Sequence, residues 1–297
     1  MNRYFKAFSL ICLIVSLASC KKDDGASIAP PRDRAEQNLA DIDSLETYLK
    51  THYIASVDED FNIDIQEIPV DGDQVSIWDQ EEYPLQTKVV TRHDVEYTIH
   101  YLILNEGVGD MPTRGDNVDV GYRGTLLDGT QFDYNPFPQS PTPLLDLVEG
   151  WQEIIPLFKS GVYVDEPGSP DPAEFTDYGA GVMFLPSGMA YFNNTPSSLV
   201  KPYSCMVFSF KLFDVDYTDL DEDGILNKFE TENGIDIADY HTDEDELPNF
   251  LDSDDDGDGY TTKREIENPE TEEPYPFEEI PTCPGGTQKK HLDKNCH

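Results

Sequence analysis

Alternation of apolar and polar residues marks a series of strands in the central part of the chain, residues 89–216. Four runs alternate strictly or are continuously apolar, and turns separate them, which predicts an antiparallel sheet. These runs are VEYTIHYLILNEG (95–107), DNVDVGYRGTLL (116–127), TQFDYN (130–135) and CMVFSFKLFDV (205–215). One segment, DLVEGWQEIIPLFKSG (146–161), has apolar residues at helical spacing and ends at a glycine. The pattern predicts an α+β fold with a sheet wrapped on one helix and Trp151 in the concave side.

A second amphipathic pattern precedes the sheet. Leu39, Ile42, Leu45 and Leu49 recur at intervals of three and four within EQNLADIDSLETYLKTHYI (36–54), which predicts a helix. This helix needs a surface to pack on, either the following domain or a second copy of itself. FNIDIQEI (61–68) alternates as a strand, and residues 72–85 read as a loop.

The N-terminus has the pattern of an export signal. Arg3 and Lys6 precede an apolar run over residues 8–18, which is too short to span a bilayer. Leu17-Ala18-Ser19-Cys20 resembles a bacterial lipobox, which implies cleavage before Cys20 and acylation of its side chain. The alternative is an ordinary signal peptide. The following KKDD resembles an export tag of surface lipoproteins in certain Gram-negative bacteria.

The charge of the chain limits its partners. The formal net charge is -40 at pH 7, and most of the acidic excess lies between residues 214 and 279. Such a field repels a phosphate backbone, so we expect no nucleic-acid partner. The expected domains are the signal peptide (1–19), a lipidated tether (20–33), an N-terminal helix and strand segment (34–88), the sheet domain (89–216), an acidic tail (217–282) and a C-terminal segment (283–297).

The sheet region carries a family resemblance. In order along the chain, EGVGDMPTRGDNVDVGYRGTLLDGTQFD, LVEGWQEIIPLFKSG, FLPSGMAYFNN and VKPYSCMVFSFKLFDV resemble the FKBP family of peptidyl-prolyl cis-trans isomerases. The resemblance implies an FKBP-like sheet around one helix and a pocket for proline-containing protein clients. It implies no cofactor for catalysis. The residues it places in that pocket are Tyr122, Phe132, Asp133, Leu147, Val148, Trp151, Tyr191, Val200 and Phe208.

These residue types suit isomerisation of a prolyl bond. Rotating a peptide bond costs about 18–20 kcal/mol, whereas X-Pro isomers differ by about 1 kcal/mol or less, so only the barrier needs lowering. An apolar pocket that strips water from the amide favours its twisted form. In this interpretation Trp151 is the floor, and Asp133 and Tyr191 supply polar contacts.

The chain departs from the family pattern near the predicted pocket. The segment between Asp133 and Leu147 is short and rich in proline, an insertion covers residues 162–178 at the helix side, and Phe192 replaces a small residue. These departures bear on substrate range. They leave open an alternative function, in which the pocket binds proline-containing segments without isomerising them.

Two loops in the acidic tail have the ligand spacing of a calcium loop, with acids at positions 1, 3, 5 and 12 and a glycine at position 6. The predicted ligands are Asp219, Asp221, Asp223 and Glu230, and then Asp254, Asp256, Asp258 and Glu265. Neither loop has an entering helix, so paired EF-hands are not expected. DEDELPNFLDSDDDGDG instead resembles thrombospondin type 3 repeats, which implies further ligands among Asp243, Asp245, Asn249 and Asp252. The alternative is a disordered acidic tail.

Three cysteines lie beyond the proposed anchor. Cys205 falls within a strand pattern, while Cys283 and Cys296 are close enough in sequence to pair, and export permits a disulfide. A zinc site using His291 and His297 is the alternative. Taken together, the sequence predicts an outer-membrane lipoprotein isomerase of the type associated with gliding, with a calcium-binding tail. It leaves the clients and the oligomeric state open.

Overall fold

The computed structural model describes residues 30–165, 174–243 and 245–296. The proposed signal peptide and Cys20 lie outside these residues. Among the described residues, no helix is both long enough and apolar enough to cross a membrane.

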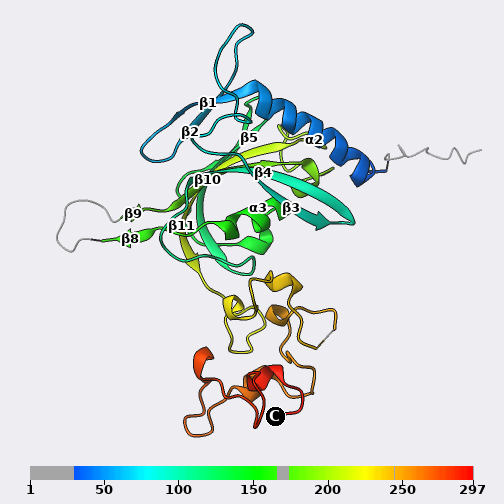
Figure 1. The fold of residues 1–297 in the computed structure, drawn as a ribbon, viewed down its shortest axis with the longest axis vertical. Coiled ribbons are helices and arrows are strands. Elements are labelled where there is room, and N and C mark those ends of the chain that lie inside the picture. The colour runs from blue at the N-terminus through cyan, green and yellow to red at the C-terminus, as the bar shows by residue number, and fades with distance from the viewer. Residues whose placement is uncertain (1–29, 166–173, 244, 297) are drawn as a thin grey trace, which may run out of the picture. The chain divides into compact units, whose positions relative to one another are not determined.

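An antiparallel sheet forms the centre of the fold (Figure 1). Its strands follow the order β3-β4-β10-β11-β5-β6, and β7 pairs with the free part of β5. The strands are β3 (Gln86–Arg92), β4 (Val95–Asn105), β5 (Asn117–Leu126), β6 (Gln131–Asn135), β7 (Thr142–Pro143), β10 (Gly179–Leu185) and β11 (Met206–Asp216). The predicted α+β fold is confirmed, as are the four predicted strands. The sequence analysis did not predict β3, although it alternates, or β10, whose residues GAGVMFL are all buried and therefore do not alternate.

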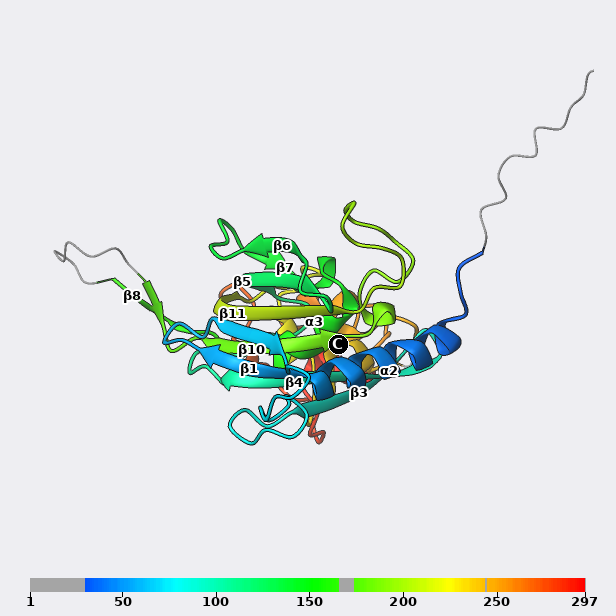
Figure 2. The same cartoon turned by 90° about the horizontal axis from the view of Figure 1, so that it is seen from above.

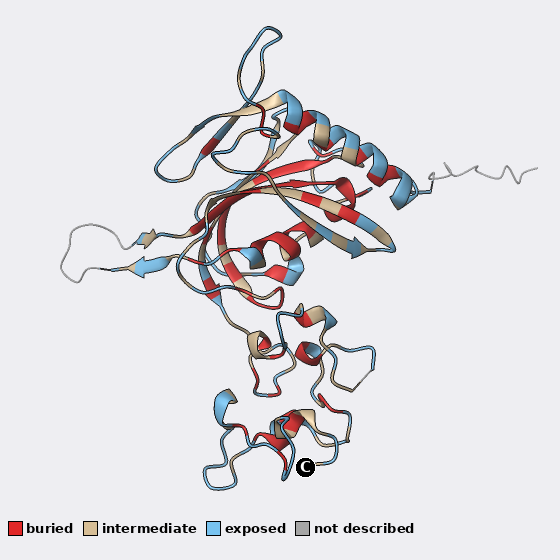
Figure 3. Cartoon of the chain, in the orientation of Figure 1, coloured by how far each residue is buried: buried red, intermediate tan, exposed pale blue. Residues whose placement is uncertain are grey.

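Helices cover the two faces of this sheet (Figure 2). On one face, α3 (Glu149–Ile154) contributes Trp151 and Ile154 to the main core. The helix is shorter than predicted, because Pro156 lies in the 3-10 turn η2 (Ile155–Leu157) that follows it. Leu147 precedes the helix, after the 3-10 turn η1 (Leu144–Asp146). Figure 3 shows the buried residues concentrated on the central strands and on α3.

The other face of the sheet packs on α2 (Arg34–Thr51), which begins after Asp33, whose side chain accepts a hydrogen bond from the Glu36 backbone N–H. Leu45 and Leu49 enter a second core with Phe184, so the surface that covers this helix belongs to the same chain. The expectation for Leu39 was wrong, since it is 70% exposed. In its place Asp41 is buried, and it accepts hydrogen bonds from the Ser187 backbone N–H and hydroxyl.

A hairpin follows α2 where the sequence predicted more helix. β1 (His52–Val57) pairs with β2 (Ile63–Glu67), so the predicted strand is present but the helix ends at Thr51. Aromatic and β-branched residues at 53, 54 and 57 favour the strand. The expected insertion forms a second hairpin from β8 (Val162–Val164) and β9 (Glu174–Thr176).

The tail contains short elements around its own small core. Ile225, Ile266 and Ile280 are buried there together. The helical turns are η4 (Asn227–Phe229), η5 (Ile237–Asp239), η6 (Asn249–Leu251), α4 (Thr262–Glu265), η7 (Phe277–Glu279) and η8 (Lys290–Leu292), and η3 (Ser187–Met189) lies in the sheet domain. Cys283 and Cys296 form a disulfide, and Cys205 is a buried free thiol.

Candidate functional site

A small hollow of about 100 Å³ lies on the α3 side of the sheet. Seven of the nine predicted pocket residues line it, from β5, β6, β11, α3 and the segments beside α3 and after β10. The lining comprises Tyr122, Asp133, Asp146, Leu147, Val148, Trp151, Tyr191 and Phe208. The sequence analysis did not predict Asp146. This exposed acid lies directly before Leu147, and no sequence motif marks it as a pocket residue.

The other two predicted residues, Phe132 and Val200, do not line the hollow. Phe132 is partly buried and meets Phe208 edge to face, with 5.5 Å between ring centroids. Val200 is buried in the main core. Phe132 therefore contacts the lining through Phe208, and Val200 belongs to the same core as the lining residues.

Trp151 forms the apolar floor of the hollow. Its side chain is 3% exposed. Tyr122 and Phe208 each meet its ring edge to face at 5.2 Å. Gly124 makes room for this cluster, because a Cβ there would lie 2.8 Å from both the Phe132 and Phe208 rings. Aromatic packing of this kind fixes the shape of the floor before any ligand arrives.

Asp133 and Tyr122 form the polar part of the rim. The Tyr122 hydroxyl donates a hydrogen bond of 2.9 Å to Asp133 Oδ2, and the Tyr134 backbone N–H donates one of 2.8 Å to Oδ1. Burial raises the pKa of Tyr122, and the adjacent carboxylate of Asp133 raises it further. Burial and Asp133 also raise the pKa of Tyr191. Both phenols therefore remain protonated donors at neutral pH.

The arrangement follows from a tight hairpin between β5 and β6. Gly129 adopts a φ of +80°, and the Thr130 backbone N–H donates to the Asp128 carboxylate. The register then pairs Gly124 with Asp133 and Tyr122 with Asn135. The aromatic and the carboxylate at the hairpin's end are thereby placed beside the hollow.

An ion-pair network holds α3 from behind the hollow. Glu153 is 2% exposed. It contacts Lys88 at 3.0 Å, Arg92 at 2.6 Å and Arg114 at 3.0 Å. Arg114 also binds the Asp236 carboxylate in the tail with two nitrogens. The helix that carries Trp151 is thus tied to β3 and to the tail.

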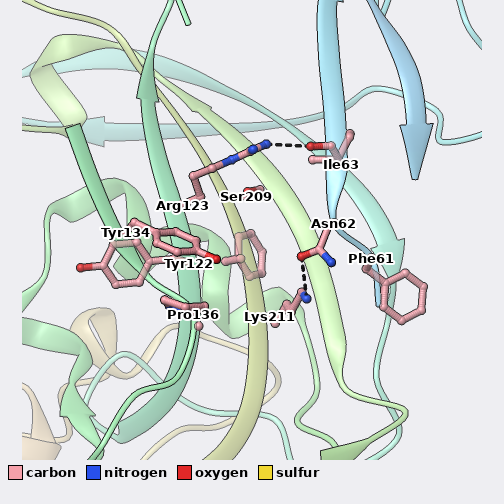
Figure 4. A pocket seen from close by; sticks show the side chains of 11 residues that line it. Phe61, Asn62, Ile63, Tyr122, Arg123, Tyr134, Pro136, Ser209 and Lys211 are labelled. Carbon is pink, nitrogen blue, oxygen red and sulfur yellow. Dashed lines mark hydrogen bonds between the residues drawn. The ribbon is translucent and has the colours of Figure 1, made fainter. Parts of the chain in front are cut away.

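A larger cavity of about 270 Å³ lies beside the β1–β2 hairpin (Figure 4). Its two cations already bind oxygens of the chain: Arg123 donates to the Ile63 carbonyl at 2.7 Å and Lys211 to Asn62 Oδ1 at 2.9 Å. These contacts join the hairpin to the sheet. The cavity lacks the Trp floor and the Tyr–Asp rim, so the smaller hollow is the better candidate for prolyl binding.

Known proteins match two parts of the chain. One relative is named as the probable FKBP-type peptidyl-prolyl cis-trans isomerase FkpA of Neisseria meningitidis serogroup B. It is 31% identical to this chain over 116 residues, which are 38% of this chain and 36% of the relative. The outer membrane protein MIP of Legionella longbeachae is 26% identical over 119 residues, 39% of this chain and 44% of the relative. The matched part of the chain is similar to FKBP-type isomerases.

The chain therefore spans less than half the length of these two relatives. A crystal structure of FkpA from Escherichia coli aligns over 72% of this chain and 71% of its own, with 21% identity and a TM-score of 0.36. The tail matches a different family model, described as BamM C-terminal, over residues 214–290. The thrombospondin-like character of the tail stays a prediction.

The two predicted calcium loops share one backbone arrangement. Gly224 and Gly259 adopt φ of +102° and +92°. Their backbone N–H groups donate to Asp219 and Asp254 respectively, each at 3.0 Å. Position 6 of a calcium loop needs such a turn. The loops therefore have the backbone geometry as well as the spacing expected for cation binding.

Acidic side chains gather into groups whose oxygens lie within 4.8 Å of one another. Among the described residues these groups are Asp219, Asp221 and Asp223; Asp223, Glu230 and Asp255; Asp243, Asp245 and Asp252; and Asp254, Asp256 and Asp258. Two unit charges at such a distance repel by roughly 3 to 4 kcal/mol at an effective dielectric constant of 20. The residues present fit calcium, because every donor is a hard oxygen.

The acidic groups differ from the predicted ligand sets in three places. Glu230 joins Asp223 and Asp255 and not the complete first loop, and Asp255 was not predicted as a ligand. Glu265 is buried but belongs to none of the four groups. Asn249 instead accepts a hydrogen bond from the Thr242 backbone N–H. Burial, with the charge of neighbouring acids, raises the pKa of Glu230 to about 10 and that of Asp255 to about 9.

Proposed function

We propose that this chain is a peptidyl-prolyl cis-trans isomerase that assists the folding of exported or surface proteins. The observation that carries the proposal is the buried Trp151 at the floor of an apolar hollow, with the Tyr122–Asp133 pair on its rim. The names of the curated relatives, FKBP-type isomerases at 27–32% identity, support it.

In the proposed mechanism the hollow favours a twisted amide over a planar one. The proline ring lies on the Trp151 indole, while Leu147 and Phe208 exclude water from its sides. Loss of amide resonance leaves the carbonyl less hydrated in the twisted state, so desolvation costs the planar form more. The phenol of Tyr191 is the donor available to the carbonyl of the twisted bond, because the Tyr122 hydroxyl donates its proton to Asp133. No nucleophile takes part, since no bond is broken.

A non-catalytic binding module is the second candidate. Both carboxylate oxygens of Asp133 already accept hydrogen bonds from the chain itself. If those bonds persist when a peptide is bound, the hollow holds proline without a free carboxylate beside the amide. Measuring both the isomerisation rate and the binding affinity of the same peptide distinguishes the two candidates. The isomerase accelerates isomerisation, whereas the binding module only binds.

We further propose that lipid on Cys20 anchors the protein to the outer membrane, so that removal of this thiol would release it. The lipobox pattern supports this, as does the name of the relative in Legionella longbeachae, an outer membrane protein. The KKDD tag favours exposure at the cell surface, of the kind associated with gliding bacteria.

Calcium is proposed as the cation of the acidic tail, where it would order the two loops as in thrombospondin type 3 repeats. The donor set and the turns at Gly224 and Gly259 support calcium.

The test of the isomerase proposal is the cis-to-trans rate of a short X-Pro peptide at catalytic concentrations of the protein, followed by exchange spectroscopy. We expect the rate to rise in proportion to protein concentration. An unchanged rate together with saturable peptide binding would support the binding module instead.

A further inference from the structure

Asp255 occupies an unusual place in the second acidic loop. It lies between Asp254 and Asp256, which group with Asp258 in their own loop. The Asp255 carboxylate groups instead with Asp223 and Glu230 of the first loop, with all ligand oxygens within 4.8 Å. The side chain of this buried acid therefore lies with the acids of the first loop, although its backbone belongs to the second loop.

Comparison of the two loops explains this orientation. The loops are offset by 35 residues, so Asp255 corresponds to Leu220 in the first loop. The Leu220 backbone N–H donates to the Asn227 side chain at 3.1 Å, and the Asp255 backbone N–H donates to the Thr262 hydroxyl at 3.1 Å. The second position thus has one backbone setting in both loops, which directs its side chain away from the ligands of its own loop. A carboxylate at that position serves a different site.

The three acids are buried, and among their carboxylate oxygens Oδ1 of Asp223 accepts a hydrogen bond from the Ile225 backbone N–H. Asp223, Glu230 and Asp255 are 1%, 3% and 2% exposed. Within the described part of the chain, neither carboxylate oxygen of Glu230 or of Asp255 has a hydrogen-bond partner, and Oδ2 of Asp223 has none. None of the three forms an ion pair with a lysine or arginine of the described residues. Buried carboxylates in this condition call for a cation.

We propose that Asp223, Glu230 and Asp255 jointly hold a calcium ion that links the first acidic loop to the second. Calcium binds oxygens at about 2.3–2.6 Å, so two ligands of one ion lie at most about 5 Å apart, as these do. Two of the three carboxylates, those of Glu230 and Asp255, border a cavity of about 300 Å³, which leaves room for water ligands beside an ion. The inference rests on the proposal that the tail binds calcium.

This linking ion has a consequence that separate loop ions lack. Loss of Asp255, a residue of the second loop, weakens calcium binding at the first. The ion also joins segments that are 25 residues apart between Glu230 and Asp255. Protease resistance of the connecting segment, residues 231–254, therefore depends on the same three carboxylates.

The test is calorimetric titration of the full chain with calcium alone. The variants are Asp255→Asn, Glu230→Gln and the double variant, and Glu270→Gln is the control, because Glu270 is exposed and outside the four acidic groups. We expect each single variant to bind one calcium fewer than the parent, the double variant to bind no fewer than either single one, and the control to match the parent.

Two calorimetric results would overturn the inference. If the parent binds calcium and Asp255→Asn binds the same number of ions with the same affinity, the linking site fails while the calcium proposal stands. If the parent binds no calcium, both fail, and peptide turnover still tests the isomerase separately. Should Asp255→Asn not fold, anomalous scattering from crystals of the parent grown with calcium decides the matter. A peak among the three carboxylates supports the site, and peaks confined to the other acidic groups refute it.

Discussion

Replacing Glu153 by glutamine should destabilise the sheet domain strongly, although the change removes only one charge. Its carboxylate is 2% exposed and neutralises three cations, of which Arg114 is itself only 6% exposed. Breaking a buried pair by removing one partner typically costs about 3–5 kcal/mol. Because Arg114 keeps its hydrogen bonds to Asp236, we expect the loss in the free energy of unfolding to lie near the lower end of this range, at about 3 kcal/mol.

Denaturant unfolding measures this loss, with calcium held constant. A loss of about 3 kcal/mol corresponds to a fall in Tm of roughly 6–12 °C for a domain of this size. Glu149→Gln is the matched control, because Glu149 lies on the same helix but pairs with His93 at the surface. Exposed pairs contribute about 0–1 kcal/mol. Equal effects of the two substitutions would refute the assigned role of the buried network.

The pH dependence of this effect has a definite sign. Burial alone would raise the pKa of Glu153, but Arg114 and Lys88 hold it below its ordinary value. A depressed pKa stabilises the folded state above the unfolded pKa of about 4.3, and this stability is lost as the pH falls through the folded pKa. The advantage of the parent over Glu153→Gln should therefore be complete near pH 7 and vanish in acid. An advantage that grows toward low pH would contradict the assignment.

Three further predictions concern the hollow, the tail and the anchor. Trp151→Ala should lose about 3–5 kcal/mol of stability, measured by denaturant unfolding, because a fully packed aromatic is removed; a loss below about 1 kcal/mol would contradict its burial. Asp223→Ala and Asp256→Ala should each weaken calcium uptake measured by calorimetry at about 0.1–1 mM, the range of extracellular modules, and no heat from the parent would favour the disordered tail. Cys20→Ser should release the protein from membranes on fractionation, and unchanged fractionation would refute lipidation.

The sequence pattern predicts which kinds of element form in the sheet domain better than it predicts where each element begins and ends. Strands β4 and β5 alternate between buried and more exposed positions and are visible in the sequence, whereas β10 is buried on both faces and shows no period. The sequence predicts too long a helix at α3, because the apolar spacing continues past Pro156, where the α-helical backbone does not. The α2 face was misjudged at Leu39, because the buried side of that helix uses polar residues such as Asp41 that find partners only in the folded chain.

The candidate site, too, can be predicted from the sequence only in part. Family resemblance located most of the hollow, since its lining residues keep their order along the chain. It could not place Asp146, or show that Asp133 is already hydrogen-bonded to Tyr122. In the tail, spacing predicts ligands within one loop. Asp255 was missed because its contacts are made across two loops.

The most direct test of the isomerase proposal compares X-Pro turnover by the parent with turnover by Asp133→Ala and Tyr191→Phe. Each substitution removes polar atoms at the hollow and leaves the Trp151 floor in place. We expect each variant to lower the turnover rate roughly tenfold, equivalent to about 1.4 kcal/mol, while peptide affinity changes little. Turnover by both variants at the parent's rate, or a parent that binds the peptide without accelerating its isomerisation, would contradict the proposed function.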